Sequence, residues 1–131
     1  MAVANLNNDP VSLSVGNDSI VIRDYFEGIR GGRTLDVTGY TPEVIKAGHV
    51  IIKSAAGEFK PMPVNAGDTA YAALPADHTY AGILVATILT ARPFAGILVR
   101  GSVNPAAAPY PMTAIQTAVS AALPLITFLA D

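Results

Sequence analysis

Residues 80–85 read Tyr-Ala-Gly-Ile-Leu-Val, and residues 94–99 repeat the pattern as Phe-Ala-Gly-Ile-Leu-Val, 14 positions later. Each copy carries three large aliphatic residues in a row, which is typical of strands buried on both faces. The intervening Thr-Ala-Arg-Pro at 90–93 has the composition of a turn. The sequence therefore predicts one hairpin, with strands at about 80–89 and 94–103. A second sheet, a helix or a neighbouring subunit would cover its faces.

The segments on either side of this hairpin complete the predicted fold. β-Branched residues at 49–53, a turn of small residues at 54–57 and a return at 58–60 predict a second hairpin. Met112, Ile115 and Val119 recur at helical spacing and predict a helix at about 112–122, followed by a final apolar strand at 125–129. Together these elements predict a mainly β fold with a short helix, a small mixed β domain of the α+β class.

The N-terminal third has a different pattern. Apolar and polar residues alternate over 11–15, Gly-Asn-Asp follows at 16–18, and Ile-Val-Ile stands at 20–22. This pattern predicts a hairpin, or one strand followed by a sharp reversal. The charged, glycine-rich residues 23–40 are expected to form a loop. We therefore divide the chain into an N-terminal hairpin or arm with its loop, residues 1–40, and a compact domain, residues 41–131.

Composition excludes several classes of protein. Of the 131 residues, 51% are hydrophobic and 14% charged, the formal net charge is −2, and there is no cysteine. The chain is too apolar to be disordered, and it lacks the positive charge that attracts nucleic acid or anionic lipid. Disulfides and thiolate chemistry are excluded. Prolines interrupt the uncharged residues 101–130, and the N-terminus does not resemble a secretory signal, so we expect synthesis in the cytoplasm.

Charge is unevenly distributed along the chain. Residues 69–131 carry only four charged side chains, those of Asp77, Arg92, Arg100 and Asp131. A monomer needs polar surface on all sides, so we expect part of this half to be covered by another subunit or partner. A surface of small alanine side chains is the alternative interpretation.

Residues for catalysis are scarce. His49 stands at the start of a predicted strand and is expected at the surface or at a sheet edge, while Asp77 and His78 belong to a predicted turn. Two histidines without a His-Glu-x-x-His motif do not form a zinc site. The glycine-rich residues 27–33 lack the Gly-Lys-Ser/Thr ending of a phosphate-binding loop, and the five tyrosines show no regular spacing. We expect no catalytic residue, no metal ligand, no cofactor and no enzymatic activity.

Several short motifs resemble those of tailed-phage head fibre proteins. They are Val-Ile-Lys-Ala-Gly-His-Val-Ile at 44–51, Gly-Glu-Phe-Lys-Pro at 57–61, Tyr-Ala-Gly-Ile-Leu at 80–84, Arg-Gly-Ser-Val-Asn at 100–104, Pro-Tyr-Pro-Met-Thr at 109–113 and Ala-Leu-Pro-Leu-Ile-Thr-Phe at 122–128. Their order also resembles the layout of the lambda-type capsid decoration proteins. The resemblance covers about residues 41–131 and depends on the order of the motifs.

The resemblance implies a homotrimer on the outer capsid surface of the virion, made in the host cytoplasm. It would bind the major capsid protein and stabilise the phage head, without nucleic-acid or membrane partners. The arm would add a strand to a capsid sheet, although it can equally belong to the domain's own sheet. The candidate capsid-contact residues are Val11, Leu13, Val15, Ile20, Val21 and Ile22. The candidate oligomer-interface residues are Tyr80, Ile83, Val85, Phe94, Ile97 and Val99.

Two other functional classes compete with this interpretation. A small carbohydrate-binding β module used in host attachment would present exposed aromatic side chains on a platform, but this chain has no tryptophan and its aromatic residues are scattered. Glycan binding therefore has no support from the sequence. A hydrolase is disfavoured by the few histidines and by the spacing of the carboxylates.

Overall fold

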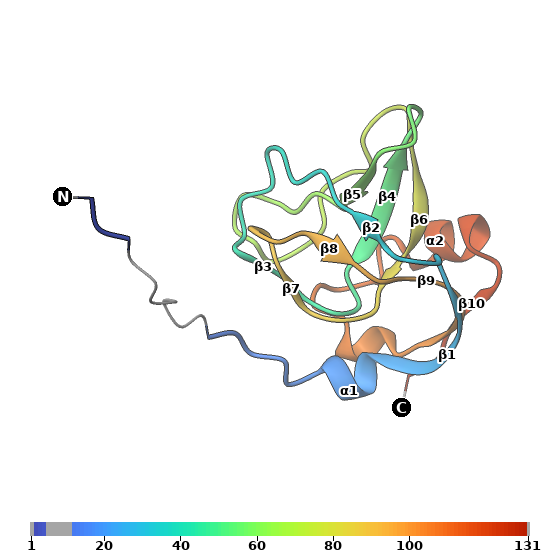
Figure 1. Ribbon diagram of the computed structural model, residues 1–131. Helices are drawn as coiled ribbons and strands as arrows, with labels where there is room; N and C mark the ends of the chain where they lie inside the picture. The colour runs from blue at the N-terminus through green and yellow to red at the C-terminus, as the bar shows by residue number, and fades with distance from the viewer. Residues whose placement is uncertain (1, 5–11, 131) are drawn as a thin grey trace.

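The two copies of the repeated motif lie side by side in the computed structural model, which describes residues 2–4 and 12–130 (Figure 1). Strands β6 (His78–Leu84) and β9 (Ile97–Val103) pair antiparallel, with Ile83 opposite Leu98. The predicted hairpin pairing is therefore confirmed. The connection between the two strands is longer than predicted, however, because the residues between Leu84 and Ile97 leave this sheet.

Each predicted hairpin strand is split into two elements. Strand β7 (Ile88–Leu89) pairs with β3 (Val44–Ile45), and β8 (Phe94–Ala95) pairs with β2 (Arg33–Thr34). These two small sheets lie to the left of β6 and β9 in Figure 1, whereas α2 lies to the right. The central sheet is thus placed between two layers of the same chain.

The main sheet has the strand order β1-β9-β6-β4-β5. Strands β4 (Val50–Ser54) and β5 (Phe59–Pro61) form the predicted second hairpin. The last strand, β10 (Ile126–Phe128), pairs in parallel with β9. Helix α2 (Gln116–Ala122) begins later than predicted, because Met112 to Ile115 form a separate turn in which the Met112 carbonyl accepts two backbone hydrogen bonds. The predicted mainly β fold with a short helix is confirmed.

Consecutive residues of the central strands face two separate hydrophobic clusters. Ile83 belongs to a cluster with Val119 of α2, whereas Leu84 belongs to a cluster with Ile45 of β3. Ile83 and Leu84 are fully buried. Burying a side chain of this size contributes about 1.5–3 kcal/mol. The chain's own layers therefore cover both faces of the sheet. The sequence had left open whether a second sheet, a helix or a neighbouring subunit would do so.

The predicted N-terminal hairpin is wrong. Residues 12–15 belong to no strand, and the β-branched segment after them forms one helical turn, α1 (Asp18–Val21). The Asp18 carboxylate accepts hydrogen bonds from the Thr87 backbone N–H at 3.0 Å and from the Thr87 hydroxyl at 2.6 Å. Asn17 donates from Nδ2 to the Ala107 carbonyl at 3.2 Å. These distant partners fix the turn despite its β propensity.

The predicted loop at 23–40 contains two strands, β2 and β1 (Ile22–Gly28). Strand β1 runs antiparallel to β9, with Ile22 opposite Val103. The main sheet therefore includes residues well before 41, and the predicted division between 1–40 and 41–131 needs correction. The sequence did not reveal this pairing, because Ile22 and Val103 are 81 positions apart and Gly28 and Leu98 are 70 apart.

Candidate functional site

Strand β1 forms one edge of the main sheet, and among the described residues no strand pairs with its outer side (Figure 1). Tyr25 is 56% exposed and Phe26 is 67% exposed. The guanidinium carbon of Arg100, on β9, lies 5.9 Å from the centre of the Phe26 ring. Aromatic and arginine side chains are enriched in protein interfaces. We call Tyr25, Phe26 and Arg100 the β1 surface, and it is the clearest candidate for contact with another protein.

The pairing of β1 with β9 is irregular. Its register shifts between Ile22 and Asp24, between Tyr25 and Glu27, and between Glu27 and Gly28. Bulges in an edge strand bend its backbone and disfavour the regular addition of a further strand. The β1 surface therefore offers a partner its side chains more than a continuous row of backbone hydrogen bonds.

The predicted capsid-contact residues separate in the structure. Val11 lies outside the described residues, and Leu13 and Ile22 are half-buried. Val15 and Ile20 are exposed, and residues 12–15 lead outward from α1 (Figure 1). Val21 is fully buried in the core and cannot touch another molecule in this fold, which corrects that prediction. Its burial follows from the helical turn, which directs it inward.

The predicted oligomer interface also needs correction. Ile83 and Ile97 are buried on opposite sides of the central sheet, so they are unavailable to another subunit. Tyr80, Val85 and Val99 are half-buried, and only Phe94 of this set is largely exposed, at 69%. The error arose because the sequence did not show that other elements of the same chain, α2 on one face and the two small sheets on the other, cover these strands.

Most large hydrophobic side chains that are exposed come from the N-terminal part of the described chain. The exposed side chains are those of Val3, Val15, Ile20, Tyr25, Phe26, Phe94, Leu125 and Leu129. Sequence reasoning missed Tyr25 and Phe26 because they stood in a segment predicted to be a loop. The sequence feature that could have identified them is the adjacent pair of aromatic residues between the charged residues Asp24 and Glu27.

His49 is fully buried, not at the surface as predicted. Its ring makes edge contacts with Tyr40, Tyr71 and Tyr110, at 5.2–5.8 Å between ring centres. Its Nε2 lies 2.9 Å from the Met62 carbonyl oxygen and donates to it, since a carbonyl only accepts. The tyrosines that looked scattered in the sequence thus enclose one histidine, and we call these four rings the His49 cluster.

Burial determines the protonation of the His49 cluster. Desolvation lowers the pKa of His49 to about 4, although the hydrogen bond to Met62 opposes this shift. Burial also raises the pKa of Tyr40 to about 12 and raises that of Tyr71 and Tyr110. The Tyr110 hydroxyl donates a short hydrogen bond to Asp68. All four rings are therefore neutral near pH 7, and the cluster joins three loops.

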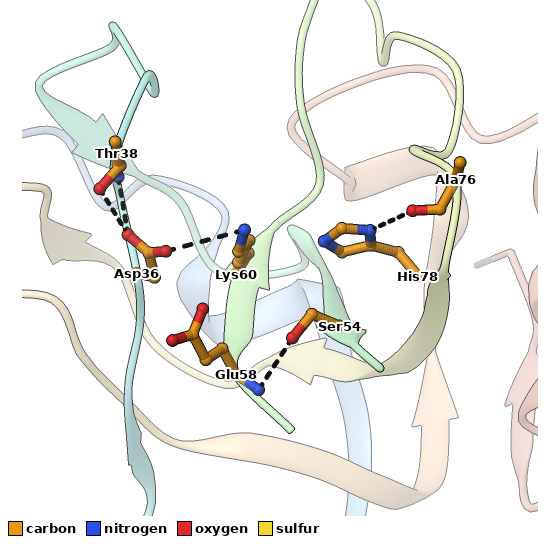
Figure 2. Close-up of polar contacts among 7 residues, drawn as sticks. All are labelled: Asp36, Thr38, Ser54, Glu58, Lys60, Ala76 and His78. Atoms are coloured by element: carbon orange, nitrogen blue, oxygen red, sulfur yellow. Dashed lines mark hydrogen bonds and ion pairs between the residues drawn. The ribbon is translucent and has the colours of Figure 1, made fainter. Parts of the chain in front are cut away.

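A half-open pocket of about 250 Å³ lies beside strands β5 and β6. Lys60 and Asp36 line it, with Nζ and Oδ2 3.7 Å apart (Figure 2). The other carboxylate oxygen of Asp36 accepts from the Thr38 hydroxyl at 2.7 Å and from its backbone N–H at 3.1 Å. These hydrogen bonds, with help from Lys60, lower the pKa of Asp36. His78, which was predicted to belong to a turn, is instead the first residue of β6, and it also lines the pocket.

Within residues 2–4 and 12–130, no group of three or more histidine, aspartate or glutamate side chains is placed to hold a metal ion. No helix in that part of the chain has the length and hydropathy of a membrane span. Protein-family models, curated proteins and solved structures provide no match to the chain.

Proposed function

We propose that this chain is a non-enzymatic virion protein, a capsid-surface head fibre or decoration protein that binds the major capsid protein and stabilises the phage head as a homotrimer. The observation that carries the proposal is the β1 surface, two exposed aromatic rings on an open sheet edge. Residues 12–15, which join no strand of the described domain, form a second segment available to a partner. The part of the proposal that names the head fibre and decoration families is supported by the order of the sequence motifs over residues 41–131.

The two exposed segments have different roles in this proposal. The β1 surface contacts a second copy of the chain, because apolar and aromatic side chains predominate in interfaces between identical subunits. Burying what remains exposed of Tyr25 and Phe26 contributes about 1–2 kcal/mol each. The residues ahead of α1 contact the capsid, with Val3 (88% exposed) and Val15 as apolar contacts.

The β1 surface is tested by the mass of the protein in solution. We expect light scattering behind size exclusion to give a mass near three times 13.5 kDa at micromolar concentration and tenfold below it. The double substitution Tyr25→Ser with Phe26→Ser is expected to give a monomer, because it removes the apolar contacts of the interface. Phe94→Ser is the matched control, an equally exposed phenylalanine on β8, and its mass is expected to be unchanged.

The outcomes of this experiment separate the parts of the proposal. A trimer that survives the double substitution contradicts the role of the β1 surface. A wild-type monomer that coats shells of its phage's major capsid protein contradicts a trimer in solution but not decoration. A monomer that fails to coat them contradicts the proposed function.

The capsid role is tested by removing residues 1–14. We expect binding to shells of the major capsid protein to weaken by about tenfold or more, since the deletion removes the exposed Val3, although Val15 remains. The unfolding midpoint should not change, because Asn17 and Asp18 still anchor α1. Co-sedimentation with shells measures the binding, and thermal unfolding checks the fold. Unchanged affinity would show that this segment does not contact the capsid.

A further inference from the structure

The hydrogen on the His78 ring is fixed by its neighbour. Nδ1 lies 2.7 Å from the carbonyl oxygen of Ala76, and because a carbonyl cannot donate, Nδ1 carries the hydrogen. With the hydrogen on Nδ1, this tautomer has Nε2 as its acceptor. Nε2 is enclosed and has no hydrogen-bond partner among the described residues. Figure 2 shows Nε2 facing the ammonium group of Lys60 across the pocket.

Lys60 stands between two acceptors. The Asp36 carboxylate is on one side and Nε2 of His78 on the other (Figure 2). The separation of 3.7 Å between Lys60 and Asp36 is longer than a hydrogen bond, so the ammonium hydrogens and Oδ2 keep capacity for a ligand. The Lys60 side chain is 32% exposed and has a flexible stem, so its ammonium group is accessible to a ligand.

The arrangement of charges selects the ligand class. Asp36 and the lone pair of Nε2 disfavour an anion, and the Lys60 ammonium disfavours a cation. A hydroxyl group satisfies both kinds of neighbour, because it donates one hydrogen bond and accepts others. Two adjacent hydroxyl groups suit the row of three side chains, one between Lys60 and His78 and the next against Asp36.

The walls of the pocket suit the carbon face of such a ligand. Tyr40, Val64 and three proline rings, Pro61, Pro63 and Pro75, line it. Proline side chains lose little conformational freedom when they are covered, so these walls are largely preformed. A volume of about 250 Å³ is below the range of drug-sized ligands and suits a single six-membered ring.

We propose that this pocket binds the vicinal diol of one sugar ring, a function additional to the assembly role proposed above. The ring lies on the proline walls, and its two adjacent hydroxyl groups contact Asp36, Lys60 and His78. A single pocket of this kind differs from an aromatic platform, so the shortage of exposed rings that spoke against a carbohydrate-binding module does not apply to it.

Titration of the full chain with methyl α-D-glucopyranoside, methyl α-D-mannopyranoside and methyl β-D-galactopyranoside tests the site, followed by amide chemical shifts. We expect saturable shifts with at least one of them, confined to residues 36–41, 60–64 and 75–78. The dissociation constant is expected in the millimolar range, because one ring makes few contacts. Lys60→Met and Asp36→Asn should each weaken binding about tenfold or more. Lys53→Met, on the neighbouring strand β4, is the matched control and should bind as the wild type does.

Three outcomes would overturn the proposal. The first is the absence of saturable shifts with all three glycosides. The second is binding that Lys60→Met leaves unchanged. The third is a stronger response of the same residues to inorganic phosphate than to the glycosides, which would identify an anion site. Mass measurements on the same samples keep this result separate from assembly, since no pocket residue belongs to the β1 surface.

Discussion

Replacing Gly82 by alanine is expected to lower the free energy of unfolding by roughly 3 kcal/mol. A β-carbon at this position would collide with a methyl group of Ile97 and would lie 2.5 Å from the carbonyl oxygen of Leu98. That oxygen belongs to the backbone of the paired strand β9 and cannot move without separating the two strands at the centre of the sheet. Thermal unfolding should show a midpoint lower by about 10 °C.

Gly96 provides a matched control, because it occupies the same place in the second copy of the repeated motif. A β-carbon there would meet only Val85, at 3.7 Å, which is ordinary contact. Gly96→Ala should therefore be neutral or stabilise the fold by about 0.5 kcal/mol, since alanine restricts the unfolded chain. Equal effects of the two substitutions would contradict the close approach of β6 and β9 at Gly82.

This pair of glycines shows what the sequence could and could not predict about the fold. The repeat and the apolar runs were sufficient to predict the strands, because burial on both faces leaves its pattern in the sequence itself. The repeat could not show that Gly82 touches the backbone of β9 while Gly96 is exposed. That difference depends on the strand register, which tertiary packing determines.

The N-terminal errors have a similar cause. The β-branched residues at 20–22 favour a strand by propensity. Ile20 and Val21 nevertheless belong to a helical turn, because Asp18 is held by Thr87, 69 positions away. Long-range hydrogen bonds of this kind override local preference. Strand β1 pairs with β9 through an interrupted register, so its irregular sequence resembled a loop.

The candidate sites were harder to predict than the fold. Predicting the β1 surface would have required knowing that Tyr25 and Phe26 lie on an open sheet edge. The His49 cluster gathers rings from positions 40, 49, 71 and 110, and no spacing in the sequence relates them. Side chains that meet through loops leave no periodic signal, so composition suggested scattered aromatic residues where the structure has a packed cluster.

The stability of the domain is expected to fall by roughly 3 kcal/mol as the pH falls from 6.5 to 4, because of His49. Burial lowers the pKa of His49 from 6.5 to about 4 in the folded state. The unfolded chain therefore binds a proton at a higher pH than the folded chain does. The stabilisation is complete above pH 6.5 and is lost as the pH falls towards the folded pKa.

Urea unfolding at fixed protein concentration, repeated between pH 7.5 and pH 4, measures this dependence, and the fixed concentration keeps any contribution from assembly constant. His49→Gln removes the titrating group and keeps a donor for the Met62 carbonyl, so its stability should vary much less over this range. His78→Gln is the matched control, since the half-buried His78 lies outside the His49 cluster, and the difference between the two variants isolates the contribution of His49. A wild-type stability that stays constant from pH 6.5 to 4 would contradict the enclosure of His49. Protonating a histidine among three neutral tyrosine rings must cost free energy that only unfolding, or opening of the surrounding loops, can relieve.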